Sequence, residues 1–328
     1  MRAPRIAIYS HKGGVGKTTL TVNIAAHLAD IGKRVLLVDS DPQCNLTSYL
    51  LDDNLVNSLL EGDPQAGGTL WNAVKPVVDA TGPITLIKPQ TSWTRIRVLA
   101  GDIQLSTFES QLAEFWGDCF RRRVRGFNGM NALADLIDST SITFKPDYVF
   151  YDCGPNIGPL NRAIILDCDF IIIPAACDIF SLRALKTLGQ ALIEWISEWG
   201  TITDLAPKDA RLLTGRPKMI GYIPQRFRTY GGLPENAASQ FMPKLERQIL
   251  ADIVTPLRAF DPKLVTSQRT AKLGELRDLG SLVTLSQEQR VALWAVVGGN
   301  QQKKSDAKAA FASIATALEK RSASHEAR

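Results

Sequence analysis

The chain contains few cysteines and histidines for its length. Five cysteines and three histidines occur among 328 residues, and no two cysteines have the C-x-x-C spacing. The usual zinc motifs are therefore excluded, and an odd, scattered set of cysteines argues against a disulfide framework. We expect a protein of a reducing, cytoplasmic compartment.

Long apolar runs are also missing. No run approaches the ~20 residues that a membrane-spanning helix needs, and the longest candidate, 170–174, is short enough to be a central strand. The first apolar segment begins at about residue 5, so we expect neither a signal peptide nor a membrane partner. The net charge is only +5, which permits an anionic partner such as nucleic acid without requiring one.

The most informative feature that is present is a glycine-rich loop. Residues 11–19 are HKGGVGKTT, and the ending Gly16-Lys17-Thr18 is typical of a phosphate-binding loop. Its glycines let backbone N–H groups face a phosphate, Lys17 adds a positive charge, and the Thr18 hydroxyl can hold Mg²⁺. The flanking patterns predict a strand at 5–10 and a helix at 18–31, whose N-terminus adds partial positive charge.

Strand-like apolar runs alternate with helical patterns along the rest of the chain. This alternation predicts an α/β fold, a mostly parallel twisted sheet with helices on both faces. We expect one domain over residues 1–328, with an irregular insertion at about 52–94 and a C-terminal helical extension at about 281–322, packed on the domain through its apolar face. Strands are expected at 5–10, 34–39, 84–88, 95–99, 147–152, 169–174 and 217–223, and helices at 18–31, 104–123, 128–139, 159–167, 181–199, 236–254, 286–297 and 303–320.

Two further segments carry acids where a nucleotide site needs them. Asp39 and Asp41 leave the end of the second expected strand, and Asp152 ends the strand at 147–152. The carboxyl ends of parallel strands line the ligand crevice of an open α/β sheet. A carboxylate there can orient a water molecule or hold the water shell of a metal ion.

Together these segments resemble the deviant Walker A P-loop ATPases of the ParA/MinD family. The similarity rests on 12–19 (KGGVGKTT), 39–43 (DSDPQ), 151–155 (YDCGP) and 173–181 (IPAACDIFS), and it covers about residues 4–200. In combination these motifs are highly specific. The pair Cys153-Gly154 departs from the Thr-Pro or Cys-Pro that is common in the family, which leaves open how this loop moves.

The resemblance implies a P-loop NTPase that works as a homodimer on ATP. Lys12 would contact the phosphates of ATP held by the partner subunit, in the manner of an arginine finger; alternatively, it is only a solvated loop lysine. Lys17 would bind the β- and γ-phosphates of its own ATP, and Asp41 would position the hydrolytic water. The resemblance also implies that ATP is bound by Gly13, Gly14, Val15, Gly16, Lys17, Thr18 and Thr19.

Mg²⁺ is the second cofactor that the resemblance implies. Thr18 would ligate the ion, Asp39 would support its water shell, and Asp152 would bind it through water. Gln225 falls where the family often has an Asn that recognises adenine. A glutamine amide could do the same, although this is a departure from the family.

ParA-like ATPases bind DNA without sequence preference and hydrolyse ATP when a partner protein stimulates them. The resemblance therefore implies a cytoplasmic, nucleoid-associated ATPase with a ParB-like or other partner, which positions a plasmid, a chromosome region or a large assembly. Its DNA contacts would be salt-dependent and would come from the cluster Arg121, Arg122, Arg123 and Arg125. Alternatively, this cluster is a solvated helix end whose cations meet the helix dipole.

Three alternatives remain at this stage. An ATP-switched regulatory subunit, for example of a defence complex, would use protein contacts through 52–94 as its output. A MinD-like membrane ATPase would need a C-terminal helix that has a basic polar face and a larger apolar face than the helix expected at 303–320. An iron–sulfur reductase of the nitrogenase-iron-protein type shares the loop, but Cys153 has no second cysteine at an obvious cluster-binding spacing.

Overall fold

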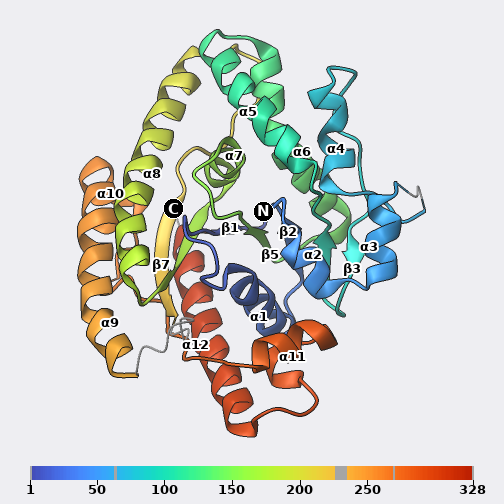
Figure 1. Ribbon diagram of the computed structural model, residues 1–328. Helices are drawn as coiled ribbons and strands as arrows, with labels where there is room; N and C mark the ends of the chain where they lie inside the picture. Colours follow the sequence, from blue (N-terminus) through green and yellow to red (C-terminus); the bar gives the residue numbers. More distant parts are fainter. Residues whose placement is uncertain (1, 63–64, 226–234, 269, 327–328) are drawn as a thin grey trace.

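The computed structural model describes residues 2–62, 65–225, 235–268 and 270–326. Its strands are β1 (Arg5–Ile8), β2 (Val35–Asp39), β3 (Gln90–Thr91), β4 (Ile96–Leu99), β5 (Tyr148–Asp152), β6 (Phe170–Ala176) and β7 (Lys218–Gln225). They form one sheet in the order β3-β4-β2-β5-β1-β6-β7 (Figure 1). Neighbouring strands are parallel except β3 and β4, which confirms the predicted fold class.

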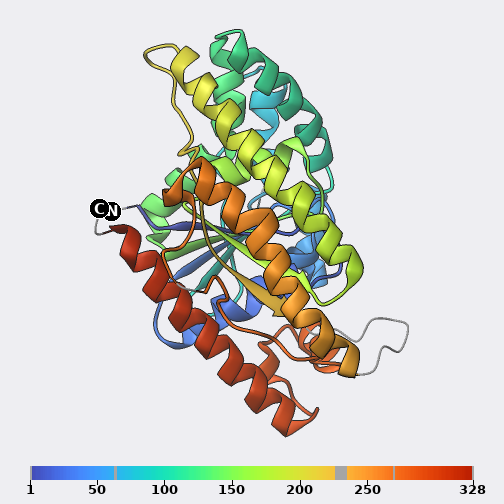
Figure 2. The same ribbon diagram turned by 90° about the vertical axis from the view of Figure 1, so that its left-hand side faces the viewer.

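Helices cover both faces of this sheet (Figures 1 and 2). They are α1 (Lys17–Asp30), α2 (Asn45–Leu50), α3 (Asp53–Leu60), α4 (Leu70–Val78), α5 (Leu105–Phe120), α6 (Val124–Phe144), α7 (Pro159–Asp167), α8 (Ile179–Leu205), α9 (Glu235–Ile249), η1 (Leu250–Val254), α10 (Thr255–Phe260), η2 (Pro262–Leu264), α11 (Leu282–Gln289), η3 (Leu293–Ala295) and α12 (Gln301–Glu326). Successive strand side chains point to opposite faces. Ile6 and Ile8 accordingly pack in one core with α1, α2, α11 and α12, and Ala7 and Tyr9 pack in the other with α4 to α10.

The central strands bring the glycine loop and the acids to one edge of the sheet. In the parallel register Asp152 of β5 stands beside Ile8 on one side and Asp39 on the other. The loop that follows β1 turns at Gly14 (φ +71°) and Gly16 (φ +79°), a backbone conformation that favours glycine. Helix α1 begins directly after Gly16, so its N-terminus lies at the same edge.

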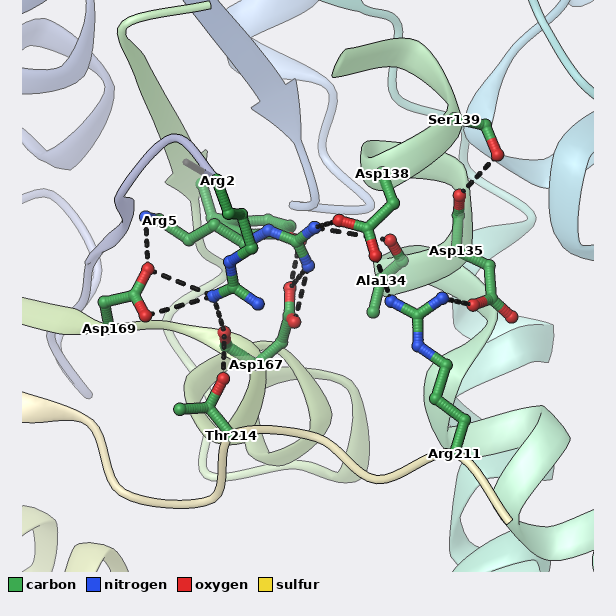
Figure 3. A network of polar contacts seen from close by, with 11 residues as sticks. Arg2, Arg5, Ala134, Asp135, Asp138, Ser139, Asp167, Asp169, Arg211 and Thr214 are labelled. Atoms are coloured by element: carbon green, nitrogen blue, oxygen red, sulfur yellow. Dashed lines mark hydrogen bonds and ion pairs between the residues drawn. The ribbon is translucent and has the colours of Figure 1, made fainter. Parts of the chain in front are cut away.

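The opposite, amino edge of the sheet is held by a network of arginines and aspartates (Figure 3). Arg5 of β1 is 1% exposed; it donates to both Asp167 oxygens at 2.6 Å and pairs with Asp138 of α6. Tyr151 also donates to Asp167, at 2.7 Å. At the rim, Arg211 bridges Asp138 and Asp135. The network joins β1, α6, α7 and the loop before β7.

One expected strand is wrong. Residues 84–88 form no strand, and the outermost strand on this side of the sheet is the short antiparallel β3 at 90–91. The apolar run lies between Pro83 and Pro89, and its backbone bonds elsewhere: Thr85 donates to the Ala73 carbonyl at 2.9 Å and Lys88 to the Gly67 carbonyl at 3.0 Å. The described parts of the expected insertion, 52–62 and 65–94, contain α3, α4 and β3.

The C-terminal extension differs in part from the expectation. The helix predicted at 286–297 is wrong for most of its length: α11 spans Leu282–Gln289 and ends where Arg290 adopts a left-handed conformation (φ +52°), and the short η3 follows it. The final helix is confirmed as α12. The expected apolar face is fully buried, so the helix packs on the domain through Phe311, Ile314, Ala315 and Leu318. None of the described helices combines the length and hydropathy of a membrane span.

Candidate nucleotide site

Lys17 lies at the centre of the glycine loop and is almost fully buried. It is 7% exposed, and its ammonium donates to the Lys12 carbonyl at 3.4 Å. Burial lowers the pKa of Lys17, while the nearby charges of Asp152 and Asp41 act in the opposite direction. A buried cation at a helix N-terminus, with glycine N–H groups around it, can hold a phosphate.

Asp152 joins the loop helix to the end of β5. Its carboxylate accepts hydrogen bonds from the Thr18 hydroxyl at 2.7 Å and the Thr21 hydroxyl at 3.1 Å. Burial raises its pKa to about 6, although both hydroxyls and Lys17 favour the charged form. Thr18 and Asp152, both expected near a metal, are therefore in direct contact.

Asp39 is held by the helix that follows it. One of its oxygens accepts from the backbone N–H of Thr47 at 2.7 Å and from its hydroxyl at 2.6 Å. The other oxygen is buried and has no partner in the described part of the chain. Burial, and then the charge of Asp152, raise the pKa of Asp39 to about 8. The orphaned oxygen is a free acceptor for the water shell of a metal ion or for another proton donor.

Asp41 stands two residues further on, close to the loop that follows β5. Its carboxylate accepts from the Gln43 backbone at 3.0 Å, and a side chain at Gly154 would begin only 3.5 Å from it. On the other side of this loop, Pro155 faces Gly13, where a Cβ would lie 3.8 Å from the Pro155 Cβ, again within van der Waals distance. The glycine loop, Asp41 and residues 153–155 thus converge on one place.

The Lys12 side chain makes its contacts at the start of α8. Its ammonium forms an ion pair with Asp178 and lies 6.0 Å from the centre of the Phe180 ring. Asp178 also caps α8, accepting from the backbone N–H groups of Phe180 and Ser181 at 2.9 Å. Burial alone would raise the pKa of Asp178, but Lys12 and these two amides outweigh it and hold the pKa below its ordinary value.

Gln225 ends β7, apart from the acids. Its side chain is 1% exposed, and its amide nitrogen has no partner among the residues that the structure describes. Its carbonyl accepts from the Cys177 backbone at 3.4 Å, at the end of the neighbouring β6. An unpaired buried amide at the carboxyl edge of the sheet could recognise a base edge.

The expected DNA-binding arginines lie at the tip of the hairpin formed by α5 and α6, at the top of Figure 1. All four are exposed. Arg123 and Arg121 pair with the buried Asp118 at 2.9 and 3.7 Å, and Arg125 lies over the Phe115 ring at 5.2 Å. Part of the charge is therefore neutralised within the hairpin.

Sequence reasoning missed three residues that hold the site: Thr21, Thr47 and Asp178. Thr21 is one helical turn beyond Lys17, which a helix of known start could have indicated. Asp178 precedes Ile179-Phe180-Ser181 as an N-cap, a recognisable signal. The contact of Thr47 with Asp39 has no such local signal.

The fold and the loop define a P-loop ATPase, and comparison with known proteins gives its family. A family model described as an AAA domain matches residues 3–200, more than half of the chain. The chain belongs to this family and, within it, to the P-loop ATPases of the ParA/MinD type.

Partition proteins are among the similar sequences. The sporulation initiation inhibitor protein Soj of Bacillus subtilis is 34% identical over 183 residues, covering 56% of this chain and 62% of Soj. The chromosome partitioning protein ParA of Caulobacter vibrioides is 32% identical over 190 residues, covering 57% of this chain and 61% of ParA. The chain thus spans about three fifths of the length of these curated relatives.

Solved structures share the fold over nearly the whole chain. A protein from Corynebacterium diphtheriae superimposes with a TM-score of 0.73 at 23% identity, covering 97% of this chain and 98% of its own. A complex of Cyanothece McdA with ATP has a TM-score of 0.59 at 17% identity, covering 97% and 96%. At these identities the likeness concerns the fold alone.

Proposed function

We propose that the chain is an ATP-hydrolysing switch that closes into a homodimer when ATP is bound. The observation that carries this proposal is the different placement of two lysines on one loop. Lys17 is buried beside Asp152 and Asp41, whereas the Lys12 ammonium points to Asp178 outside this group. In the dimer Lys12 would exchange Asp178 for a triphosphate held by the second copy, where it would stabilise transition-state charge.

The same residues support a role for ATP with Mg²⁺. The described residues contain no cluster of three or more His, Cys, Asp or Glu side chains arranged for a metal. Mg²⁺ in phosphate sites, however, uses one or two carboxylates besides phosphate oxygens and waters. Thr18, Asp152 and the free oxygen of Asp39 would hold it, and the ion would supply positive charge at the phosphates.

Asp41 is the residue that we assign to the attacking water. Its carboxylate lies beside Gly154, at the mouth of the loop after β5, and is 7% exposed. A carboxylate in such a position orients water and accepts its proton as the bond to the γ-phosphate forms. Lys17 would hold the β- and γ-phosphates, and Gln225 the adenine.

The biological output that we propose is ParA-like positioning. Relatives named as chromosome partitioning proteins support it. The ATP-bound dimer would bind DNA non-specifically, and a partner protein would stimulate hydrolysis and release it. The exposed arginines of the α5–α6 tip would contribute to the DNA surface.

Light scattering and ATP turnover test the switch. With Mg²⁺-ATP we expect a dimer for Asp41→Ala, because bound ATP is not hydrolysed, and a monomer for Lys12→Ala, which should still bind the nucleotide. Lys308→Ala, an exposed lysine of α12, is the control and should behave as the unchanged chain. A strictly monomeric Asp41→Ala protein at saturating ATP would remove the basis of the proposal.

DNA retention tests the output. The unchanged chain and a variant with Ala at 121, 122, 123 and 125 are compared without nucleotide, with ADP and with ATP, at several salt concentrations. We expect ATP-dependent binding whose salt slope becomes shallower by about 0.9 for each phosphate that the variant no longer neutralises. Equal slopes would leave the arginines as a solvated helix end.

One observation favours a second candidate, an ATP-switched subunit whose output is a protein contact. Ile179 and Phe180 are 48% and 67% exposed at the start of α8, beside the Lys12–Asp178 pair. Exposed apolar side chains at a nucleotide-dependent contact suit a protein partner. ATP-dependent dimerisation without any DNA retention would favour this candidate.

A further inference from the structure

The C-terminal extension contains a segment, outside the region matched by the family model, that contacts the two helices flanking the nucleotide site. We call this segment, residues 282–295, the C-terminal strap; it comprises α11, the turn at Arg290 and η3. The family model ends at residue 200. Figure 1 shows α11 beside α1, on the face of the sheet that α12 also covers.

The strap is bonded to α2, the helix that follows Asp39 and Asp41. The Ser286 hydroxyl donates to the Val291 carbonyl at 2.5 Å. Since a hydroxyl has one proton, the buried Tyr49 hydroxyl must donate to Ser286 in their 2.5 Å contact. Arg290 donates from Nε to the Leu51 carbonyl at 2.8 Å and pairs with Asp53.

The strap is also bonded to the loop helix α1. The backbone N–H of Leu293 donates to the side-chain oxygen of Asn23 at 2.9 Å. Asn23 is fully buried, and its amide in turn donates to the Thr19 carbonyl at 2.9 Å. The strap therefore connects the helix that begins in the glycine loop with the helix that follows the acids.

Helix α2 is short, and its other bonds lead directly to the acids. It has six residues, one of which, Thr47, holds Asp39 through two hydrogen bonds. The backbone N–H of Cys44, just before the helix, donates to the Asp41 carbonyl at 2.8 Å. A helix of six residues is too short to be stable by itself, so its position depends on what it is bonded to.

We infer that the C-terminal strap positions Asp39 and Asp41 through α2, and that Tyr49, Ser286 and Arg290 are positioning residues for ATP hydrolysis. This inference rests on the proposed ATPase function. In the described part of the chain no hydrogen bond joins the strap to the loop glycines or to Lys17, and the bonds of Tyr49 and Arg290 lie on the α2 side, so we expect these residues to affect hydrolysis more than nucleotide binding. Loosening the strap should displace the acids and slow the chemical step while leaving the affinity for ATP in place.

Hydrogen exchange and steady-state kinetics of Tyr49→Phe and Arg290→Ala test this inference. Tyr49→Phe removes one hydroxyl and keeps the ring, so the chain should fold. In the nucleotide-free chain we expect amide exchange across residues 41–51 to rise about tenfold. We expect kcat for ATP to fall by about tenfold, since small misplacements of catalytic groups cost one to two orders of magnitude, with KM changed by less than about twofold. Arg290→Lys, which keeps the charge facing Asp53, should recover part of the loss.

Arg321→Ala is the matched control. Arg321 also lies in the extension and also donates to backbone carbonyls, those of Ile220 at 2.6 Å and Lys272 at 2.8 Å, but it does so at β7, away from α2. It should leave the exchange of 41–51 and kcat unchanged. Unchanged exchange in both Tyr49→Phe and Arg290→Ala, or faster exchange with unchanged kcat, would overturn the inference. A chain that hydrolyses no ATP would overturn the proposed function instead, and the exchange data would still report on the strap.

Discussion

The two edges of the central sheet both bury charged side chains, yet they differ in how completely these charges are paired. At the amino edge, Arg5 bonds to Asp167 and pairs with Asp138, and among the described residues Nε is the one nitrogen of its side chain left without a partner (Figure 3). At the carboxyl edge, Lys17 forms no ion pair within the described ranges, and one Asp39 oxygen is unpaired.

This difference separates residues that hold the fold from residues that await a ligand. A buried charge costs free energy unless its partners replace the lost water. At the amino edge the chain supplies these partners itself. At the carboxyl edge the cost is offset only when a ligand arrives, which is why unpaired buried groups there point to a binding site.

The largest effect is expected at the amino edge. Arg5→Met should lower the free energy of unfolding by about 3–5 kcal/mol, because it leaves the buried carboxylate of Asp167 without its cation. Chemical denaturation measures this, and ATP affinity of the folded fraction should be unchanged. Arg211→Ala, which breaks the half-exposed rim pairs of the same network, should cost less than about 1 kcal/mol. Equal losses for the two variants would contradict the importance of burial.

At the carboxyl edge a substitution should weaken ATP binding without lowering the free energy of unfolding. Lys17→Met should weaken ATP binding by about 100-fold, since a charge-assisted hydrogen bond of roughly 3 kcal/mol is lost. The nucleotide-free chain should be as stable as before or more stable, because an unpaired buried cation has been removed. Calorimetric titration with ATP and thermal unfolding measure the two effects. A clear loss of stability would mean that Lys17 serves the fold, as Arg5 does.

The raised carboxyl pKa values give the third prediction. Asp39 and Asp152 bind protons more tightly in the folded chain than in the unfolded chain, with pKa values of about 8 and about 6. Between pH 4 and pH 8 the folded state therefore holds more protons, and the stability of the nucleotide-free chain should fall as the pH rises through this range. Asp39→Asn should flatten this dependence between pH 6 and pH 8. A stability that rises with pH there in both proteins would contradict burial as the main influence on these acids.

How far the sequence predicts each region follows from how local the determining contacts are. The glycine loop is set by Gly14, Gly16 and the strand and helix beside them, so the motif and its flanking patterns were enough to predict the local backbone that carries Lys17 and Thr18. The position of Asp152 could be predicted because it ends the expected strand at 147–152. The bond between Tyr49 and Ser286 spans 237 residues, and no local pattern marks it.

The expected strand at 84–88 failed for a related reason. Its apolar run is compatible with a strand, but whether a run joins a sheet depends on which backbone lies beside it. Here Thr85 meets the Ala73 carbonyl of α4, and the flanking Pro83 and Pro89 limit further pairing. Which distant backbone a segment bonds to, here as in the strap, cannot be predicted from the sequence of that segment alone.

The smallest effect is expected where the two kinds of pairing meet, at Lys12. Its partner Asp178 is in the same chain. Lys12 is thus paired by the chain itself, as Arg5 is at the amino edge, although it lies in the glycine loop at the carboxyl edge. Asp178→Asn should keep the cap of α8, because Asn caps helices as well as Asp, while it removes the charge that holds Lys12. The lysine side chain is 28% exposed, so the pair is worth less than about 1 kcal/mol. We therefore expect ATP-dependent dimerisation to strengthen only about threefold, measured by light scattering in the background of Asp41→Ala. Weaker dimerisation would show that Asp178 belongs to the dimer contact itself and that its pairing with Lys12 does not compete with that contact.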